Sequence, residues 1–228
     1  QLQQDNTINF NQALKCKHIE LRPKSPNQEK LILSLLDTHT SITVATGPAG
    51  TGKTYLAMLA AIKAFRNGEC ERLVLTRPAV GVDDEKHGFL PGDLNSKMEP
   101  WTRPLFDVLR EFYSAKEVAR MIQEQIIEIS PLAFMRGRTF KDAWIVADEM
   151  QNATPSQMKM LMTRIGENSK IVITGDVEQT DRTVNNNGLI DLCKRLETQR
   201  DGLSVCYMNN RDIQRHPIIG TVLEIYAT

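Results

Sequence analysis

The sequence predicts an α/β domain in which a largely parallel sheet lies between two layers of helices. Three observations support this fold class. Short apolar, β-branched runs alternate along the chain with longer segments of helical periodicity. A glycine-rich segment, Gly47–Thr54, joins one such run to a helical segment. Another apolar run ends in Asp148 and Glu149. Strands that alternate with helices favour βαβ units and hence a parallel sheet.

The composition is that of an ordinary globular domain. The 228 residues are enough for one sizeable α/β domain and few for two. We therefore expect an N-terminal arm or edge strand over residues 1–24 and one domain over residues 25–228. No apolar run reaches membrane-spanning length, and the first ten residues lack the apolar core of a signal peptide. The expected location is the cytoplasm, without a membrane partner.

The net charge and the spacing of the cysteines limit the classes of partner and site that the chain can be expected to have. Lys+Arg and Asp+Glu number 28 each, so the net charge is zero. A nucleic-acid partner would therefore need a local basic strip. The four cysteines form no C-x-x-C pair, which indicates neither a zinc site nor a disulfide framework and favours a reducing compartment.

The elements can be expected in order along the chain. Ser25 is a helix cap and Pro26 opens the first helix, whose apolar side consists of Leu31, Ile32, Leu35 and Leu36. Strands are expected at 41–46, 72–76, 126–130, 143–149, 170–176 and 203–207. Further helices are expected at 52–66, 93–112, 115–125, 155–166 and 189–196, the second of these interrupted by Pro100 and Pro104. A long connection over 79–104 carries an acidic turn.

The glycine-rich segment fits G-x-x-x-x-G-K-[ST] at every fixed position. Between a strand and a helix, this pattern predicts a phosphate-binding loop. Glycines let the backbone N–H groups turn inward, and the following helix adds the positive end of its dipole. Lys53 is expected on the β- and γ-phosphates, and the Thr54 hydroxyl on Mg²⁺. The predicted nucleotide-binding residues are Gly47, Pro48, Ala49, Gly50, Thr51, Gly52, Lys53, Thr54 and Tyr55.

Asp148 and Glu149 form the second strong signal. In phosphate-loop ATPases, an Asp at a strand end holds Mg²⁺ through water and a neighbouring Glu activates the attacking water. The pair lies ~90 residues after the loop, within the same alternation of strands and helices. We predict that Asp148 and Glu149 play these two roles.

Other candidates carry weaker signals. Gln28 either reads adenine through paired amide hydrogen bonds or is a solvated residue of a first helical turn. Thr76 and Arg77 end a strand, where open α/β sheets contact substrate. Arg136 and Arg138 flank a glycine and either contact phosphate or carboxylate groups or belong to a solvated loop.

The last candidates follow the fifth and sixth expected strands. Gln179 is placed to sense the γ-phosphate. Arg211 or Arg215 is a candidate arginine finger, acting either in its own site or across a subunit interface.

Together these motifs resemble the PhoH family of phosphate-loop ATPases, whose core is similar to the first motor domain of superfamily 1 helicases. GFLPGD and MRGRT are more specific than the phosphate loop itself. The segments that carry the resemblance are GPAGTGKT (47–54), LTRPAV (75–80), GFLPGD (88–93), PLAFMRGRT (131–139), DEMQN (148–152), QMKMLMTRIG (157–166), TGD (174–176) and RHP (215–217).

The resemblance implies a RecA- or helicase-like three-layer fold and ATP hydrolysis with Mg²⁺. It makes Gln28 the adenine reader, Gln179 a γ-phosphate contact and Arg215 a finger within a homo-oligomeric ring, with a hexamer among the expected forms. It also implies links to phosphate starvation and to single-stranded RNA or DNA. A composition rich in Asn and Met would suit a protein of a bacterial virus. The expected location would then be the cytoplasm of the host.

The expected function is therefore ATP hydrolysis coupled to single-stranded nucleic acid, with Thr76, Arg77, Arg136 and Arg138 as the candidate contacts. An alternative is an ATP-gated assembly protein that moves no polynucleotide. A small-molecule kinase is a third option, disfavoured by the acidic pair and the lack of an obvious acceptor-binding lid.

Overall fold

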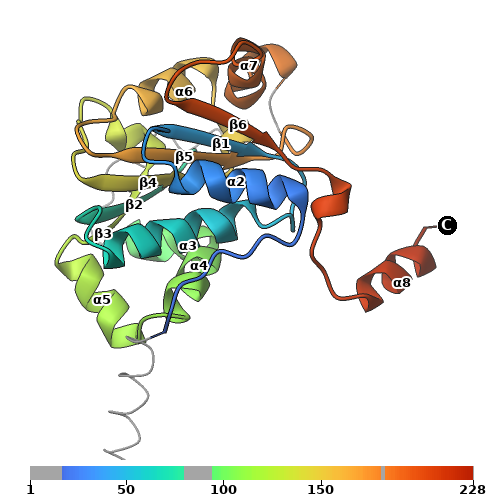
Figure 1. Ribbon diagram of the computed structural model, residues 1–228, viewed down its shortest axis with the longest axis horizontal. Helices are drawn as coiled ribbons and strands as arrows, with labels where there is room; N and C mark the ends of the chain where they lie inside the picture. Colours follow the sequence, from blue (N-terminus) through green and yellow to red (C-terminus); the bar gives the residue numbers. More distant parts are fainter. Residues whose placement is uncertain (1–16, 80–93, 181–182, 228) are drawn as a thin grey trace, which may run out of the picture.

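The computed structural model describes residues 17–79, 94–180 and 183–227, and within them the chain forms a three-layer α/β domain (Figure 1). The acidic turn of the 79–104 connection and the GFLPGD segment lie outside the described residues. The strands are β1 (Ile42–Thr46), β2 (Arg72–Arg77), β3 (Ile127–Pro131), β4 (Ala143–Ala147), β5 (Lys170–Gly175) and β6 (Leu203–Tyr207). The α-helices are α2 (Pro26–Leu36), α3 (Lys53–Arg66), α4 (Leu94–Arg110), α5 (Ala115–Gln123), α6 (Pro155–Met162), α7 (Gly188–Arg195) and α8 (Ile218–Ile225). Short 3₁₀ helices are η2 (Leu132–Met135), η3 (Met150–Asn152), η4 (Val184–Asn186) and η5 (Asn210–Asp212).

The six strands form one sheet in the order β3-β2-β4-β5-β1-β6, and every pairing is parallel. This confirms the predicted fold class. The sheet order matters for the site because β5 lies between β1 and β4, so that the carboxyl ends of these three strands meet at one edge.

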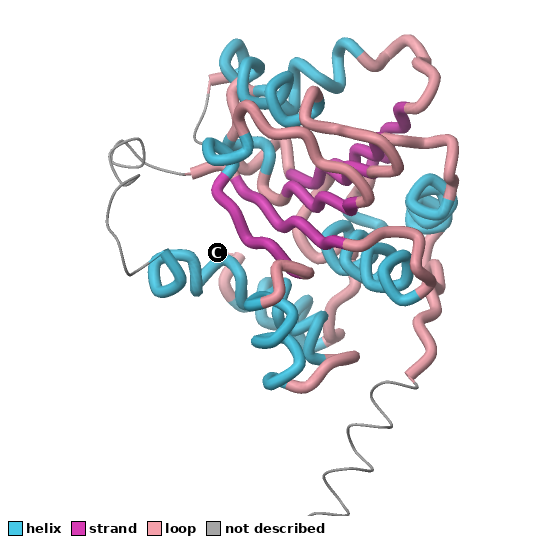
Figure 2. The backbone as a smooth tube through the Cα atoms, turned by 90° about the vertical axis from the view of Figure 1, so that its left-hand side faces the viewer, coloured by secondary structure: helices cyan, strands magenta, loops and turns pink. Residues whose placement is uncertain are grey.

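Helices cover both faces of the sheet (Figures 1 and 2). Residues of α2, α3, α4 and α5 share one hydrophobic cluster with one side of the strands, and residues of α6 and α7 share a second cluster with the other side. Alternation along β2 shows the reason: Leu73 and Leu75 belong to the first cluster and Val74 to the second. Strands buried on both faces read as continuous apolar runs.

The arm preceding α2 is described from residue 17, and residues 17–24 form no strand. Ile19 and Leu21 are nevertheless buried in the first cluster. Among the described residues, no helix combines the length and the apolar character needed to cross a bilayer.

Several expected boundaries differ from the structure. Leu36 was expected on the apolar side of α2, but its side chain is 46% exposed. At 100° per residue, it lies roughly 140° from the buried Leu31, beyond the packed face. Helix α4 continues through Pro100 and Pro104, and its buried Leu105 and Leu109 hold it against the core. The strand expected to reach residue 149 ends at Ala147, because Glu149 turns the chain with φ 55°.

Helices at 115–125 and 155–166 were expected to be longer, and they end at Gln123 and Met162. Gln125 has φ 59°, a left-handed conformation that does not continue an α-helix. Helix α8 was not expected from the sequence at all.

Candidate functional site

The phosphate loop follows β1 and ends in α3, as the sequence predicts. Gly47, Gly50 and Gly52 have φ of 149°, 79° and 85°, which disfavour residues with a side chain. A Cβ atom at Gly47 would also lie 2.5 Å from the Met208 carbonyl oxygen. The loop therefore needs glycine both for its own curvature and for the chain that passes beside it.

Lys53 begins α3 and is buried over the loop. Its Nζ donates hydrogen bonds to the carbonyl oxygens of Gly47 and Pro48, both at 2.7 Å. Burial lowers the pKa of the Lys53 ammonium, while the nearby carboxylates of Asp176, Asp148 and Glu149 act in the opposite direction. The positive charge of Lys53 is thus held at the N-terminus of a helix. The lysine charge and the helix dipole both favour an anionic ligand there.

Asp148 lies directly after β4, and its carboxylate joins three parts of the fold. Its Oδ1 accepts a hydrogen bond from the Thr54 hydroxyl at 3.0 Å and one from the Thr174 hydroxyl at 2.7 Å. Thr174 is on β5, the strand between β1 and β4. These hydroxyl and carboxylate oxygens are the hard donors that Mg²⁺ prefers, so the residues present fit the expected metal.

Glu149 is held by two neighbours, Gln151 just beyond the turn and Arg77 at the end of β2. Gln151 Nε2 donates a hydrogen bond to Glu149 Oε2, and Arg77 Nη2 lies 3.4 Å from Glu149 Oε1. Gln151 is 2% exposed, and its Oε1 accepts from the backbone N–H of Asp176 at 3.1 Å. Gln151 was missed as a site residue, although it lies within the DEMQN segment just after the acidic pair.

A cavity of about 260 Å³ opens between these groups. Gln179, which is exposed, is among the residues that line it. Tyr55 also borders it, and its hydroxyl donates to Glu111 at 3.2 Å. The cavity is lined by Ala49, Gly50, Gly52, Lys53, Thr54, Tyr55, Asp148, Glu149, Gly175, Asp176 and Gln179.

Gln28 is buried beneath the loop rather than solvated. Its Nε2 donates to the Thr51 carbonyl at 3.0 Å, and its Oε1 accepts from the Lys24 N–H at 2.9 Å. A Cβ at Gly52 would lie 3.0 Å from the same amide nitrogen. Gln28 therefore supports the loop in this structure, and the reading of adenine remains a prediction.

The four residues predicted to contact nucleic acid differ in accessibility. Thr76 is fully buried, and Arg77 faces Glu149. Arg138 makes two hydrogen bonds to the Glu128 carboxylate, at 2.7 and 3.0 Å, and lies over the Phe140 ring. Arg136 is exposed in the loop after η2.

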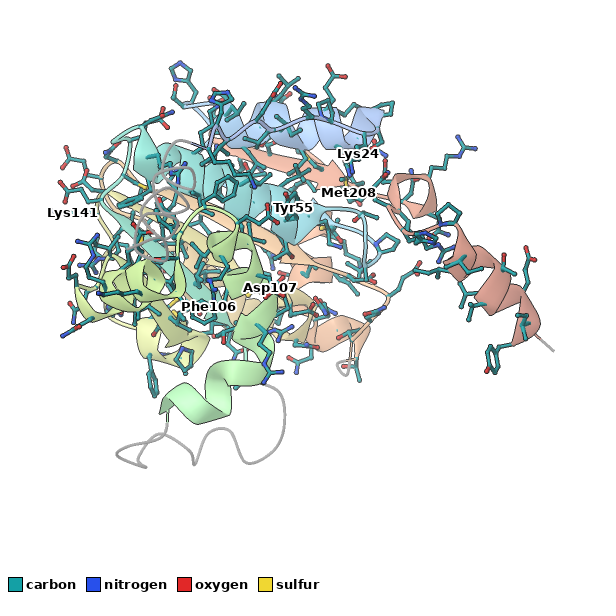
Figure 3. All side chains as sticks on the ribbon, turned by 90° about the horizontal axis from the view of Figure 1, so that it is seen from below. Lys24, Tyr55, Phe106, Asp107, Lys141 and Met208 are labelled. Carbon is teal, nitrogen blue, oxygen red and sulfur yellow. The ribbon has the colours of Figure 1, made fainter. Side chains whose placement is uncertain are left out.

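The chain after β6 passes along the phosphate loop. The Met208 N–H donates to the Thr46 carbonyl at 2.7 Å, and the Gln214 N–H donates to the Gly50 carbonyl at 2.8 Å. Figure 3 shows Met208 toward the side of the molecule from which the chain leads out to α8. Arg211 and Arg215 are exposed on this segment. Among the described residues that line the cavity, neither arginine is present.

The fold and this site define a phosphate-loop NTPase: a parallel sheet places a glycine-rich loop with its lysine beside an acidic pair from another strand. More narrowly, the chain belongs to the PhoH family. The family profile, described as "PhoH-like protein", matches residues 20–227.

Three curated relatives show the extent of the similarity. The chain is 45% identical over 185 residues to a PhoH-like protein of Synechocystis, covering 81% of the chain and 56% of the relative. It is 42% identical over 211 residues to a PhoH-like protein of Bacillus subtilis, covering 92% and 65%. It is 37% identical over 187 residues to Protein PhoH of Escherichia coli, covering 80% and 52%. The chain thus spans about half to two thirds of the length of these relatives.

Solved helicase structures are more distantly similar. The helicase domain of Pyrococcus furiosus Hef aligns with a TM-score of 0.48 and 11% identity, covering 84% of this chain and 39% of that one. The Pif1 helicase from Candida albicans aligns with a TM-score of 0.40 and 16% identity, covering 88% and 43%.

Proposed function

We propose that this chain binds ATP and hydrolyses it with Mg²⁺. The observation that carries this proposal is the Asp148 carboxylate, which bonds to Thr54 of the loop and Thr174 of β5, with Glu149 directly after it. A structural salt bridge would not need a lysine at a helix N-terminus, a hydroxyl and two adjacent carboxylates around one cavity.

Each residue has a distinct task in the proposed reaction. The loop N–H groups and Lys53 hold the phosphates and neutralise their charge. Glu149 accepts the proton of the water that attacks the γ-phosphate in line. Gln151 holds the Glu149 carboxylate, and Gln179 lines the same cavity. Mg²⁺, held by Thr54 and through water by Asp148, would supply further charge neutralisation when bound with ATP.

The test is steady-state release of phosphate from ATP and Mg²⁺. Glu149→Gln should keep ATP binding and lose roughly 10²- to 10⁴-fold in kcat, because only the proton acceptor is removed. Lys53→Ala should abolish turnover, because the γ-phosphate loses its cation. Gln199→Ala, at an exposed position outside the site, is the control. Full turnover in Lys53→Ala would remove the proposal.

A second proposal is that single-stranded nucleic acid, RNA in the first instance, stimulates this hydrolysis. The Arg77 guanidinium lies 3.4 Å from Glu149 at the carboxyl end of β2. An Arg77 that bound a phosphate group instead would change the charge facing Glu149, so that polynucleotide binding and hydrolysis would be coupled. The exposed Arg136 follows η2, next to the neighbouring strand β3, and is the natural second contact.

Arg77→Ala should therefore reduce the stimulation of kcat by single-stranded RNA and flatten the salt dependence of RNA binding. Arg136→Ala should weaken RNA binding with little effect on hydrolysis without RNA. Lys141→Ala, an exposed change on the loop before β4, serves as the matched control. RNA binding and salt slope unchanged in both arginine variants would favour the rival function, an ATP-gated assembly protein in a homo-oligomeric ring.

A further inference from the structure

Strand β6 forms one edge of the sheet, so the side of its backbone that faces away from β1 has no strand beside it (Figure 1). At one end of β6 the Gly202 carbonyl accepts hydrogen bonds from β1, and at the other end the Met208 N–H donates to β1. Alternate residues of a parallel strand bond to the same neighbour. The backbone groups of Ser204 and Cys206 therefore also face β1.

The backbone groups of Leu203, Val205 and Tyr207 face outward. The Leu203 N–H donates to the Arg200 carbonyl at 3.2 Å. Within the described parts of the chain, the N–H and C=O groups of Val205 and Tyr207 have no backbone partner. They lie two residues apart, roughly 6.5 Å along the strand. An extended peptide presents its own donors and acceptors with the same repeat, so these groups match the backbone of an additional strand.

The opposite edge strand, β3, is protected against such pairing, and β6 is not. Glu128 lies within β3 and accepts two hydrogen bonds from Arg138, at 2.7 and 3.0 Å, and Pro131 ends the strand without an N–H. Charges and prolines of this kind prevent exposed edges from pairing with other chains. The residues of β6, LSVCY, include neither a charge nor a proline. Strand β6 thus lacks the features that block the addition of a strand.

Two grooves follow this edge and offer apolar contacts to side chains. One, of about 540 Å³, is lined by Leu196 and Val205, and the other, of about 500 Å³, is lined by Ile190 and Cys193 of α7. Tyr207 lines both grooves and is 56% exposed. Every second side chain of an added strand would point to the side of the sheet on which α7 lies. Apolar side chains at these positions would be received by the two grooves.

The surroundings of the edge are acidic. The charged residues and the histidine that line the two grooves are Asp37, Asp176, Glu178, Glu197 and Asp201 against Lys194, Arg200 and His39. Glu178, Glu197 and Asp201 are exposed, and none of them forms an ion pair with another described residue. Negative charge that is not paired within the chain favours a partner with lysine or arginine at the rim of the contact.

We propose that β6 is a docking edge for an extended segment of a partner protein, which joins the sheet as an additional strand. Backbone hydrogen bonds to Val205 and Tyr207 provide the pairing, as in other cases of β-strand addition. The segment has apolar, β-branched residues at its centre and Lys or Arg at its ends, near Glu178, Glu197 and Asp201. About five residues match the length of β6.

Binding of synthetic peptides tests the proposal, with fluorescence anisotropy as the readout and without nucleotide. The probe is the fluorescein-labelled peptide KTVIVTK with uncharged ends. The peptide ETVIVTE has the same centre and the opposite charge, and it should bind at least about tenfold more weakly. A form of KTVIVTK that is N-methylated at its three central residues keeps every side chain and loses three backbone donors. It should bind at least about tenfold more weakly than KTVIVTK.

Hydrogen exchange of single amides, followed by NMR, locates the bound peptide. In the free chain the amides of Val205 and Tyr207 should exchange fast, whereas those of Ser204 and Cys206 should exchange slowly because they are bonded to β1. Saturating KTVIVTK should slow exchange of the first pair at least about tenfold, because their N–H groups gain partners. A peptide that only adheres to the apolar grooves would not produce this alternation.

Variants of the chain test the same edge. Val205→Pro removes an outward N–H and leaves the hydrogen bonds to β1 in place, so the variant should fold and lose peptide binding. Glu197→Lys should weaken binding of KTVIVTK and strengthen binding of ETVIVTE. Glu71→Lys is the matched control for charge, because this exposed residue precedes β2, which β4, β5 and β1 separate from β6. Circular dichroism checks that each variant is folded.

Three results would overturn the proposal. The first is a wild type that does not bind KTVIVTK at millimolar concentration, or that binds the N-methylated form equally well. The second is peptide binding that leaves the exchange of Val205 and Tyr207 unchanged. The third is slow exchange of these two amides in the free chain that depends on protein concentration, because the edge would then be occupied by β6 of a second copy. If Val205→Pro does not fold, the N-methylated peptide alone decides whether backbone pairing takes place.

Discussion

Gln151 connects two strands of the site through one side chain. Its amide nitrogen donates to Glu149 and its amide oxygen accepts from Asp176, so the position of the Glu149 carboxylate depends on the end of β5. Space around it is tight, because a Cβ at Gly175 would lie 2.7 Å from the Gln151 oxygen. Glu149 itself holds φ 55°, a conformation that a non-glycine residue keeps only when its surroundings fix it.

We predict that Gln151→Leu lowers kcat roughly 10- to 100-fold and leaves ATP affinity nearly unchanged. The change removes the partner that orients Glu149 without touching the loop or Lys53, and small misplacements of a reacting group have effects of this size. Single-turnover hydrolysis and nucleotide titration separate the two effects, with Gln199→Leu, at an exposed position outside the cavity, as control. A rise in the Kd for ATP at constant kcat would contradict the assignment.

Local patterns in the sequence pointed to some residues of the candidate site and not to others. Lys53, Asp148 and Glu149 follow from motifs whose spacing lies within one loop or at one strand end. Thr174 and Gln151 act through neighbours set by the sheet order, which places β5 between β1 and β4. That order is a property of the tertiary fold, and no local periodicity encodes it. Burial of Gln28 under the loop was hidden for the same reason.

At the scale of elements, Lys170, the first residue of β5, caps the carboxyl end of α2. Its Nζ donates to the carbonyl oxygens of Ser34 and Leu35 in the last turn and of Asp37 beyond it, at 2.7, 2.9 and 3.1 Å. These are carbonyls that a helix end leaves without partners, and a cation there also complements the helix dipole. The Nζ lies 5.5 Å from the centre of the Trp144 ring.

This buried lysine predicts a pH dependence of stability. Burial lowers the pKa of Lys170 to about 8 from its ordinary 10.5, with Asp37 acting weakly in the opposite direction. Between these values, the unfolded chain binds more protons than the native state, so this group makes the free energy of unfolding rise with pH from about 8 to about 10. Lys170→Met removes that contribution.

Urea unfolding of the wild type and Lys170→Met at several pH values gives the measurement. The difference in free energy of unfolding, wild type minus variant, should increase across this range. Taking the difference cancels other groups that titrate there, such as the buried Cys70 thiol, whose pKa burial raises to about 11. A difference that is constant or falls with pH would refute the prediction.

The periodicity of the sequence predicted the types of most elements, but it predicted the residues at which they end less well. All six strands were expected, because buried parallel strands read as apolar runs. The ends of β4 and α5 depend on single left-handed residues, Glu149 and Gln125. Nothing about a glutamate or a glutamine side chain predicts that backbone conformation. Helix α8 has Pro217 at its N-cap position, in place of the Ser, Thr, Asp or Asn that marks a helix start, so its eight residues were not recognised as a helix.

At the scale of the whole molecule, nucleotide binding should stabilise the entire fold. The proposed ligand contacts the ends of β1, β4 and β5, and a ligand bound only by the native state adds about 2.7 kcal/mol at one hundred times its Kd. We predict that ATP with Mg²⁺ raises Tm, and that Asp148→Asn loses the part of this increase that depends on Mg²⁺. Differential scanning fluorimetry with ATP, with and without EDTA, is the measurement. An equal Mg²⁺-dependent increase in Asp148→Asn would count against that carboxylate as the metal contact.

The hydrogen bonds from Met208 and Gln214 to the phosphate loop also have a consequence during synthesis. Domains form from the N-terminus onward as the ribosome delivers the chain, and the loop at 47–54 is made before the segment after β6. Its flanking partners, Met208 and Gln214, arrive more than 150 residues later. A nascent chain stalled before residue 208 would therefore carry the complete binding motif without the neighbours that hold it in shape. Competence to bind nucleotide should appear late, in a single step, once the segment after β6 has left the exit tunnel.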